Sequence, residues 1–195
     1  MKLTLLRHGI TLGNARRLYY GSTDLPLLPQ GLEALGRLRQ TWTYPTGARY
    51  YTSGMRRTEE TLLALYGPVN HGVLPGLREM DFGAFEMKSY EELKEDPAYQ
   101  AWITGDFEAN VCPGGESGVL VTRRALHALE PVLAAGQDTV CITHGGVIGG
   151  LLAHWFPGTG RYDWTPEPGR GFQVTFQAGQ PVAAEPVPFP GSGRA

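Results

Sequence analysis

Two short apolar segments, far apart in the chain, each end in a His-Gly pair. Residues 3–6 lead into Arg7-His8-Gly9, and residues 139–143 lead into His144-Gly145-Gly146. A short apolar run bounded by a glycine turn is typical of a buried strand. In a mainly parallel sheet the carboxyl ends of the strands meet at one edge, and ligands bind there. We therefore expect both histidines to emerge at the same edge of one sheet.

Between and after these segments, the chain alternates helical and strand patterns. Helices are expected from Pro29 to about Trp42, from Ser53 as N-cap to Gly67, from Ser89, from Pro97, and over 116–135, where Pro131 must kink or divide the helix. Strands are expected over 48–52 and, as a last edge strand, over 172–176. This alternation predicts an α/β fold, a three-layer α/β/α sandwich with a mainly parallel central sheet. Of the other histidines, His71 and His127 are expected to be exposed and His154 to lie in the core.

The composition carries no strong charge bias. A net charge of -2 with 18% charged residues gives no basic surface for nucleic acid or an anionic membrane, and no apolar stretch approaches the roughly 20 residues of a membrane span. Cys112 and Cys141 lack the spacing of a zinc site or a disulfide framework, so we expect reduced thiols and a cytoplasmic location. We expect a single domain over residues 1–184 and a flexible tail over 185–195, and the oligomeric state is left open.

Arginine and histidine are the residue types that a phosphoryl group needs. Arg7 and His8 follow the first strand, His144 follows a later one, and Arg56 and Arg57 fall in the first turn of a helix, where backbone N–H groups and a guanidinium would converge on an anion. A neutral imidazole can attack phosphorus, and neighbouring guanidinium groups favour the neutral form.

A carboxylic acid must also protonate the leaving alkoxide in such a reaction. Glu79 lies among apolar residues in the segment 73–86 and is the candidate for that task, after which it would accept a proton from water. Asp81 and Glu86 of the same segment also lie next to aromatic residues, and the alternative for all three acids is that they are charges at the rim. The long aperiodic segment 11–31 is expected to be a binding loop beside His8.

Four motifs, LLRHG, TSGMRRTEET, LREMDFGAFE and ITHGG, resemble those of the histidine phosphatase superfamily, the phosphoglycerate mutase-like proteins, over residues 2–156. The resemblance implies metal-independent chemistry without a cofactor, through a phosphohistidine at His8. It further implies that Arg7, Arg57 and His144 bind the phosphoryl oxygens and that Glu79 donates the proton. It places Asn14, Tyr20, Gly21 and Gly145 on the phosphate side. Arg57 is preferred to Arg56 on the register of the motif.

The resemblance is to the phosphatase branch, which includes α-ribazole phosphatases and broad-specificity enzymes. Gly145-Gly146 after His144 and the sequence PGGES at 113–117 are typical of that branch, whereas Ile10, Leu28 and Met87 depart from residues common in the family. The expected substrate is a small phosphorylated metabolite. Arg16, Arg17, Tyr19, Tyr20 and the region 101–118 are expected to line the leaving-group side.

Three alternatives to a phosphomonoesterase stay open. One is a cofactor-dependent phosphoglycerate mutase, which would need a bisphosphoglycerate primer. Another is a metalloenzyme in which His8, His144 and Glu79 form a two-histidine, one-carboxylate triad, although Arg7 and Arg57 beside a divalent cation would be costly. The last is a non-catalytic protein that binds a phosphorylated ligand, which would need neither a nucleophile nor an acid.

Overall fold

The structure is a computed structural model, and it describes residues 1–191 of the 195-residue chain. Its centre is a six-stranded sheet with the order β5-β4-β7-β1-β8-β9. The strands are β1 (Lys2–Arg7), β4 (Arg49–Thr52), β5 (Gly72–Val73), β7 (Thr139–Thr143), β8 (Gly171–Gln177) and β9 (Gln180–Val187). The first four strands of that order are parallel, and β8 and β9 continue the sheet in antiparallel pairing.

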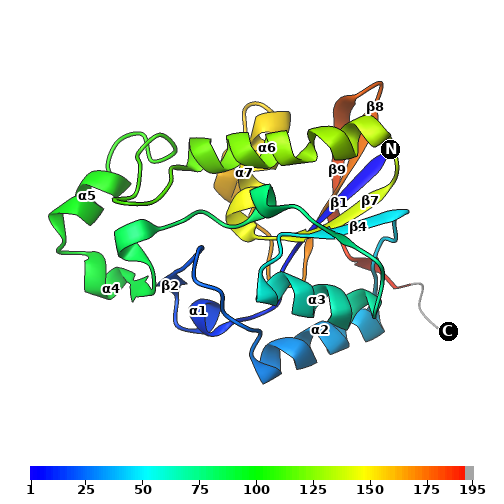
Figure 1. Cartoon of the computed structure of the whole chain (residues 1–195), viewed down its shortest axis with the longest axis horizontal. Coiled ribbons are helices and arrows are strands. Elements are labelled where there is room, and N and C mark those ends of the chain that lie inside the picture. Colours follow the sequence, from blue (N-terminus) through cyan, green and yellow to red (C-terminus); the bar gives the residue numbers. More distant parts are fainter. Residues whose placement is uncertain (192–195) are drawn as a thin grey trace.

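Helices cover both faces of this sheet. Helices α2 (Pro29–Thr41) and α3 (Arg56–Tyr66) pack together on one face, and α6 (Gly118–Ala135) and α7 (Gly145–Trp155) pack together on the other (Figure 1). The expected three-layer α/β/α sandwich with a mainly parallel sheet is confirmed. In the chain from residue 1 to 191, no helix is both long and apolar enough to cross a membrane.

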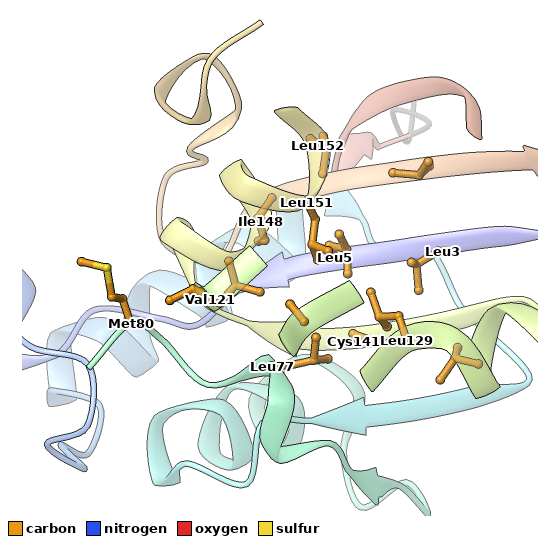
Figure 2. Close-up of a cluster of buried hydrophobic side chains, with 14 of the residues drawn as sticks. Leu3, Leu5, Leu77, Met80, Val121, Leu129, Cys141, Ile148, Leu151 and Leu152 are labelled. Atoms are coloured by element: carbon orange, nitrogen blue, oxygen red, sulfur yellow. The ribbon is translucent and has the colours of Figure 1, made fainter. Parts of the chain in front are cut away.

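Alternation along the central strands divides the core between the two faces. Leu3 and Leu5 of β1 and Cys141 of β7 join a buried cluster with residues of α6 and α7, among them Leu129 and Ile148 (Figure 2). Their neighbours in sequence, Leu6, Val140 and Ile142, point the other way and pack with Leu35, Leu62 and Leu65 from α2 and α3. Because successive strand residues face opposite sides, the two nearly continuous apolar strands can supply both cores.

A group of short elements lies beyond the carboxyl ends of the parallel strands (Figure 1). They are α1 (Leu12–Ala15), β2 (Leu18–Tyr19), β6 (Lys88–Ser89), α4 (Tyr90–Leu93) and α5 (Pro97–Ile103), with the 3₁₀ helices η1 (Pro75–Leu77), η2 (Gly83–Phe85) and η3 (Arg161–Trp164) in the neighbouring connections. A further pair, β3 (Trp42–Thr43) and β10 (Phe189–Pro190), forms a separate two-stranded ribbon. The edge expected to carry the site is therefore surrounded by connecting segments.

The C-terminal part of the chain is more ordered than its composition predicts. Residues 180–187 form β9 and residues 189–190 form β10, so the expectation of a flexible tail from 185 is wrong over these residues, and only 192–195 lie outside the described part. Proline is tolerated here because β9 is an edge strand, where one row of N–H groups has no partner to lose. Because β9 pairs with the outer side of β8, β8 is an inner strand, and the prediction that it is the last edge strand is wrong.

Three further details differ from the sequence-based predictions. Helix α3 has Met55 and not Ser53 as its N-cap, because Gly54, with φ 77°, turns the chain between them. Helix α6 is not divided at Pro131. His154 is exposed, since the buried face of α7 ends at Leu152. The starts expected at Pro29, Ser89 and Pro97 are confirmed to within one residue.

Candidate active site

The two His-Gly pairs meet because their strands are neighbours. Strands β1 and β7 are parallel, with Arg7 opposite Thr143, so the next residues, His8 and His144, lie side by side at the carboxyl edge. Their ring centroids are 5.1 Å apart and the ring planes are inclined by 62°. Both side chains are buried. The prediction that the histidines share one edge is confirmed.

Local hydrogen bonds fix the ring of His8. Its Nδ1–H donates to the carbonyl oxygen of Gly9 over 2.7 Å, since a carbonyl can only accept, and the neutral ring then has its lone pair on Nε2. The Gly9 N–H in turn donates to Oγ1 of Thr61 on α3 (2.9 Å). Burial, and then the positive charges of Arg57 and Arg7, lower the pKa of His8 well below 6.5 despite the opposing Gly9 bond, so the ring is neutral at pH 7.

His144 is held through both ring nitrogens. Arg57 Nε–H donates to Nδ1 over 3.3 Å, so the neutral ring carries its proton on Nε2, which donates to Ser53 Oγ at 2.9 Å. Ser53 directly follows β4, the other neighbour of β7. Burial, followed by the charge of Arg57 and the proximity of His8, lowers the pKa of His144 well below 6.5.

Arg57 and Arg56 occupy opposite environments at the start of α3. The Arg57 side chain is fully buried, and its two terminal nitrogens donate to backbone oxygens, Nη1 to Thr23 and Nη2 to Gly21, each over 2.9 Å. Its guanidinium carbon lies 5.0 Å from the centre of the Tyr20 ring. Arg56 is 63% exposed and pairs with Glu60. Of these two arginines, only Arg57 is hydrogen-bonded to one of the two buried histidines, His144.

Glu86 secures the loop that holds Arg57. Its carboxylate accepts backbone N–H bonds from Gly21, Ser22 and Thr23, together with the Thr23 hydroxyl and the Phe82 N–H. Burial would raise the pKa of Glu86, but these hydrogen bonds outweigh it and the pKa is lowered. A single half-buried carboxylate thus fixes the loop whose carbonyl groups orient Arg57.

Arg7 brings a second guanidinium to the cluster. Its Nη1 donates to the carbonyl of Pro166 over 2.8 Å, whereas Nε is buried and has no hydrogen-bond partner within residues 1–191. A Cβ at Gly145 would lie 3.2 Å from Nε and Cζ of Arg7. Glycine at the first position of α7 therefore allows the guanidinium to lie against the helix N-terminus.

Asn14 is oriented so that its amide nitrogen makes no hydrogen bond to any residue between 1 and 191. Its Oδ1 accepts three bonds, from the backbone N–H and the hydroxyl of Thr11 and from the hydroxyl of Tyr20, over 2.9–3.0 Å. Thr11 also caps α1, on which Asn14 lies. The Tyr20 ring fits against Gly13, where a Cβ would approach ring carbons to 2.3 Å. This packing leaves two amide N–H donors of Asn14 for a ligand.

Glu79 lies at the N-terminus of α7. Its Oε2 accepts from the Gly146 N–H and its Oε1 from its neighbour Met80 N–H, each over 3.0 Å. Arg124 of α6 fixes the segment that carries it, by donating to the carbonyl oxygens of Gly76, Arg78 and Glu79. The same guanidinium forms a bidentate pair with Glu116 (both 2.8 Å). The Glu79 carboxyl group is therefore fixed in two ways, by its own bonds to backbone N–H groups and by the bonds from Arg124 to the backbone of its segment.

A cavity of about 220 Å³ opens beside Glu79 and Gly146. Its wall includes Tyr19 and, from the 101–118 region, Trp102, Phe107 and Gly118. These residues were expected on the leaving-group side, whereas Arg16 and Arg17 do not line this cavity.

The alternative of a metal triad does not match the geometry. His144 has both ring nitrogens engaged by Ser53 and Arg57, and Glu79 binds backbone N–H groups. Across the described range 1–191, no three His, Cys, Asp or Glu side chains form a group that could hold a metal ion.

Several residues of the site were not predicted to belong to it. Ser53 was expected to cap a helix, and its place directly after β4 was the signal that could have assigned it to the edge. Arg124 and Arg161 act through contacts between distant loops and helices, for which the sequence pattern gives no signal, whereas Glu116 lies in the region 101–118 that was expected on the leaving-group side.

Comparison with known proteins gives consistent matches. The sequence model described as Histidine phosphatase superfamily (branch 1) matches residues 3–175. The chain is 33% identical to the adenosylcobalamin/alpha-ribazole phosphatase of Salmonella typhimurium over 159 residues, 78% of each protein. The alpha-ribazole phosphatase of Shigella flexneri has the same fold, with a TM-score of 0.82, 23% identity and coverage of 93% of this chain and 94% of that one. A phosphoglycerate mutase of Thermus thermophilus matches with a TM-score of 0.73, 30% identity and coverage of 94% of this chain and 98% of that one.

Proposed function

Since the chain belongs to branch 1 of the histidine phosphatase superfamily, we propose that it is a phosphomonoester hydrolase that transfers a phosphoryl group through His8. The observation that carries the proposal is the state of His8. Its ring is buried, neutral and fixed through Nδ1, with the lone pair of Nε2 free, between the guanidinium groups of Arg7 and Arg57. A nucleophilic imidazole needs that protonation state, and a phosphoryl group needs those charges.

The phosphoryl oxygens are bound by donors that have no hydrogen-bond partner in the part of the chain that the structure describes. Arg7 Nε and the amide N–H groups of Asn14 are such donors. Arg57 supplies the second positive charge near the phosphorus, and the neutral ring of His144 lies beside His8. Tyr20 and Gly21 hold Asn14 and Arg57 in place, and Gly145 makes room for Arg7. Fixed donors of this kind stabilise the charge that develops on the equatorial oxygens.

The reaction proceeds in two steps with Glu79 as the proton carrier. His8 Nε2 attacks phosphorus, the ester P–O bond breaks, and the protonated Glu79 gives its proton to the departing alkoxide. Glu79, now a carboxylate, takes a proton from water as the water oxygen attacks phosphorus, the P–N bond breaks, and inorganic phosphate leaves. The position of Glu79 between Gly146 and the 220 Å³ cavity supports this role.

The substrate in this proposal is a small phosphorylated metabolite, as the name of the Salmonella relative indicates for that protein. A phosphoglycerate mutase would share the first step and differ in the acceptor, because it passes the phosphoryl group to a second hydroxyl and not to water. Chemistry by His8 and Glu79 requires no metal ion.

The proposal is tested by phosphate release from a panel of phosphomonoesters by chelator-treated enzyme, with His8→Ala alongside. We expect chelator-resistant release that is lost in the variant. Reactions with ³²P-labelled ester that are stopped with denaturant at alkaline pH should show label on histidine, since the P–N bond is stable in alkali and is broken by acid. Loss of release with chelator, or release that survives His8→Ala, would refute it. Net hydrolysis of 3-phosphoglycerate without a bisphosphoglycerate primer separates a phosphatase from a mutase.

Glu79→Gln tests the proton donor. We expect a large loss of kcat/KM for alkyl phosphates, whose leaving alkoxides need a proton, and a small loss for p-nitrophenyl phosphate, whose leaving group is stable without one. Equal losses for the two esters would contradict the assignment.

A further inference from the structure

The cavity beside Glu79 is walled by a continuous series of aromatic rings. Tyr19, Phe82, Trp102, Phe107 and Tyr162 line it. Successive rings are in contact, with centroid separations of 5.4 Å for Phe82 and Tyr19, 4.9 Å for Trp102 and Phe107, and 5.9 Å for Phe107 and Tyr162. The alcohol part of an ester whose oxygen lies at Glu79 would therefore extend into a space lined by ring faces and edges, which favour flat apolar groups.

Arg161 is the one positively charged side chain in the described lining of this cavity, and its charge is already paired. Nε and Nη2 form a bidentate bridge to Glu108, at 2.7 and 2.5 Å. Nη1 donates to the carbonyl of Gly146, and Nη2 also donates to the carbonyl of Gly118 and to the Thr122 hydroxyl. Every nitrogen of the guanidinium thus has a protein acceptor.

Glycines on α7 give Arg161 the room for this arrangement. A Cβ at Gly149 would lie 2.4 Å from the Arg161 carbonyl oxygen, and one at Gly150 would lie 2.6 Å from Nη1. The guanidinium therefore lies flat between α7 and the start of α6, and it would keep its backbone acceptors if Glu108 lost its charge. With Glu79 protonated, as the first step of the proposed reaction requires, the charges of Glu108 and Arg161 cancel, so no net positive charge faces the cavity.

We propose that the Glu108–Arg161 pair sets the leaving-group specificity of this site, so that esters of uncharged aromatic alcohols are accepted and esters whose alcohol carries a carboxylate are rejected. The inference rests on the proposed phosphatase function. The physical basis is that a carboxylate in the cavity would lose its hydration and would find no unpaired cation among the described lining residues, because Arg161 is already paired with Glu108. An aromatic ring has no such cost and gains contact with the walls.

The test compares two esters that differ by one carboxylate, benzyl phosphate and 4-carboxybenzyl phosphate. For the wild-type protein we expect kcat/KM to favour benzyl phosphate by about 100-fold, on the order of the discrimination that an uncompensated buried charge produces. In Glu108→Gln, Arg161 keeps its bonds to Gly146 and Gly118 and its charge becomes available, so this preference should shrink about tenfold, mainly through a lower KM for the carboxylated ester.

Glu130→Gln is the matched control. Glu130 lies on α6, is exposed and pairs with exposed His127 away from this cavity, so its substitution should leave the preference unchanged. Tyr162→Ala tests the aromatic wall at a side chain that is 70% exposed and therefore not needed for folding. It should raise KM for benzyl phosphate by a larger factor than KM for ethyl phosphate, and equal changes for the two esters would contradict the role of the aromatic wall.

Equal kcat/KM for the two esters in the wild-type protein would overturn the inference, and this comparison depends on no variant that must fold. A preference that Glu108→Gln leaves as it is, or that Glu130→Gln shifts equally, would overturn the role of Glu108. Failure of the proposed function would look different, because the wild-type protein would then release phosphate from neither ester, nor from p-nitrophenyl phosphate.

Discussion

Nε of Arg57 donates to Nδ1 of His144 over 3.3 Å, deep in the protein, so a fully buried guanidinium is bonded to a neutral ring. Its nearest carboxylate, Asp24, is 3.9 Å away and half exposed. The positive charge is therefore held by carbonyl groups and a ring nitrogen, which orient it without neutralising it. An arrangement of this kind keeps the charge available for an anion.

Arg57→Lys should lower kcat/KM by about 100-fold or more, because one ammonium group cannot replace a fork that contacts Gly21, Thr23 and His144 together. Steady-state kinetics and a thermal melt measure activity and folding separately. Arg56→Lys, one residue away and exposed, is the control and should keep kcat/KM within about twofold. Similar losses in the two variants would contradict the distinction between the arginines.

Arg124→Lys should impair proton transfer more than phosphoryl binding. The substitution releases the carbonyl groups of Gly76 and Glu79, so the Glu79 carboxyl loses its fixed position. We expect kcat/KM for an alkyl phosphate to fall by about 100-fold, and for p-nitrophenyl phosphate by only a few-fold, within the usual contribution of general acid catalysis. Arg123→Lys, the exposed neighbour on α6, should change neither value. A uniform loss for both esters would indicate a general defect instead.

The free energy of unfolding should fall as the pH drops below about 6.5. His8 and His144 have lowered pKa values in the folded protein and usual values near 6.5 when unfolded, so below that pH the unfolded chain binds protons that the folded protein does not. Each group contributes a slope of up to about 1.4 kcal/mol per pH unit. Urea denaturation at pH 7.5, 6 and 5 measures how the free energy of unfolding depends on pH, and His8→Asn should remove about half of that slope. An unchanged slope in His8→Asn would contradict the pKa direction of His8.

Met87→Gly should stabilise the protein. Met87 has φ 61°, in the left-handed region that costs a residue with a Cβ about 1 kcal/mol, and its N–H donates to the Tyr19 carbonyl, which holds it there. Glycine is also more flexible than methionine in the unfolded chain, which offsets part of this gain. We therefore expect the free energy of unfolding to rise by about 0.5 kcal/mol, measured as a higher urea midpoint. Ala178→Gly, at φ 48° in the exposed β8–β9 turn, has the same backbone change without a buried side chain and should act in the same direction. Lower midpoints in both variants would contradict the argument.

Local patterns predicted the sheet and the histidine pair well. The apolar runs before His8 and His144 identified the two central strands, and parallel pairing then placed the two rings together. These features depend on properties of neighbouring residues, which a sequence displays directly. The choice of Arg57 over Arg56 came from the family motif, and the burial of the two side chains agrees with it.

Features that depend on contacts between distant segments could not be predicted. Glu86, Arg124 and Arg161 were not assigned to the site, because their roles come from carbonyl groups and carboxylates that the fold brings from other loops. The strand β9 was missed because its prolines suggested a loose tail, and only pairing with β8 shows them to be on an edge. His154 was misplaced because the burial of a helix residue depends on where the packed face ends.

The pairing of β1 also has a consequence during synthesis of the chain. Both neighbours of β1 come late, since Leu3 pairs with Thr139 of β7 and with Val174 of β8. At ribosomal rates of about 5–20 residues per second, the apolar first strand waits on the order of ten seconds for a partner. Throughout that interval the nascent chain exposes an unpaired hydrophobic strand, which makes it a target for chaperones and a starting point for aggregation.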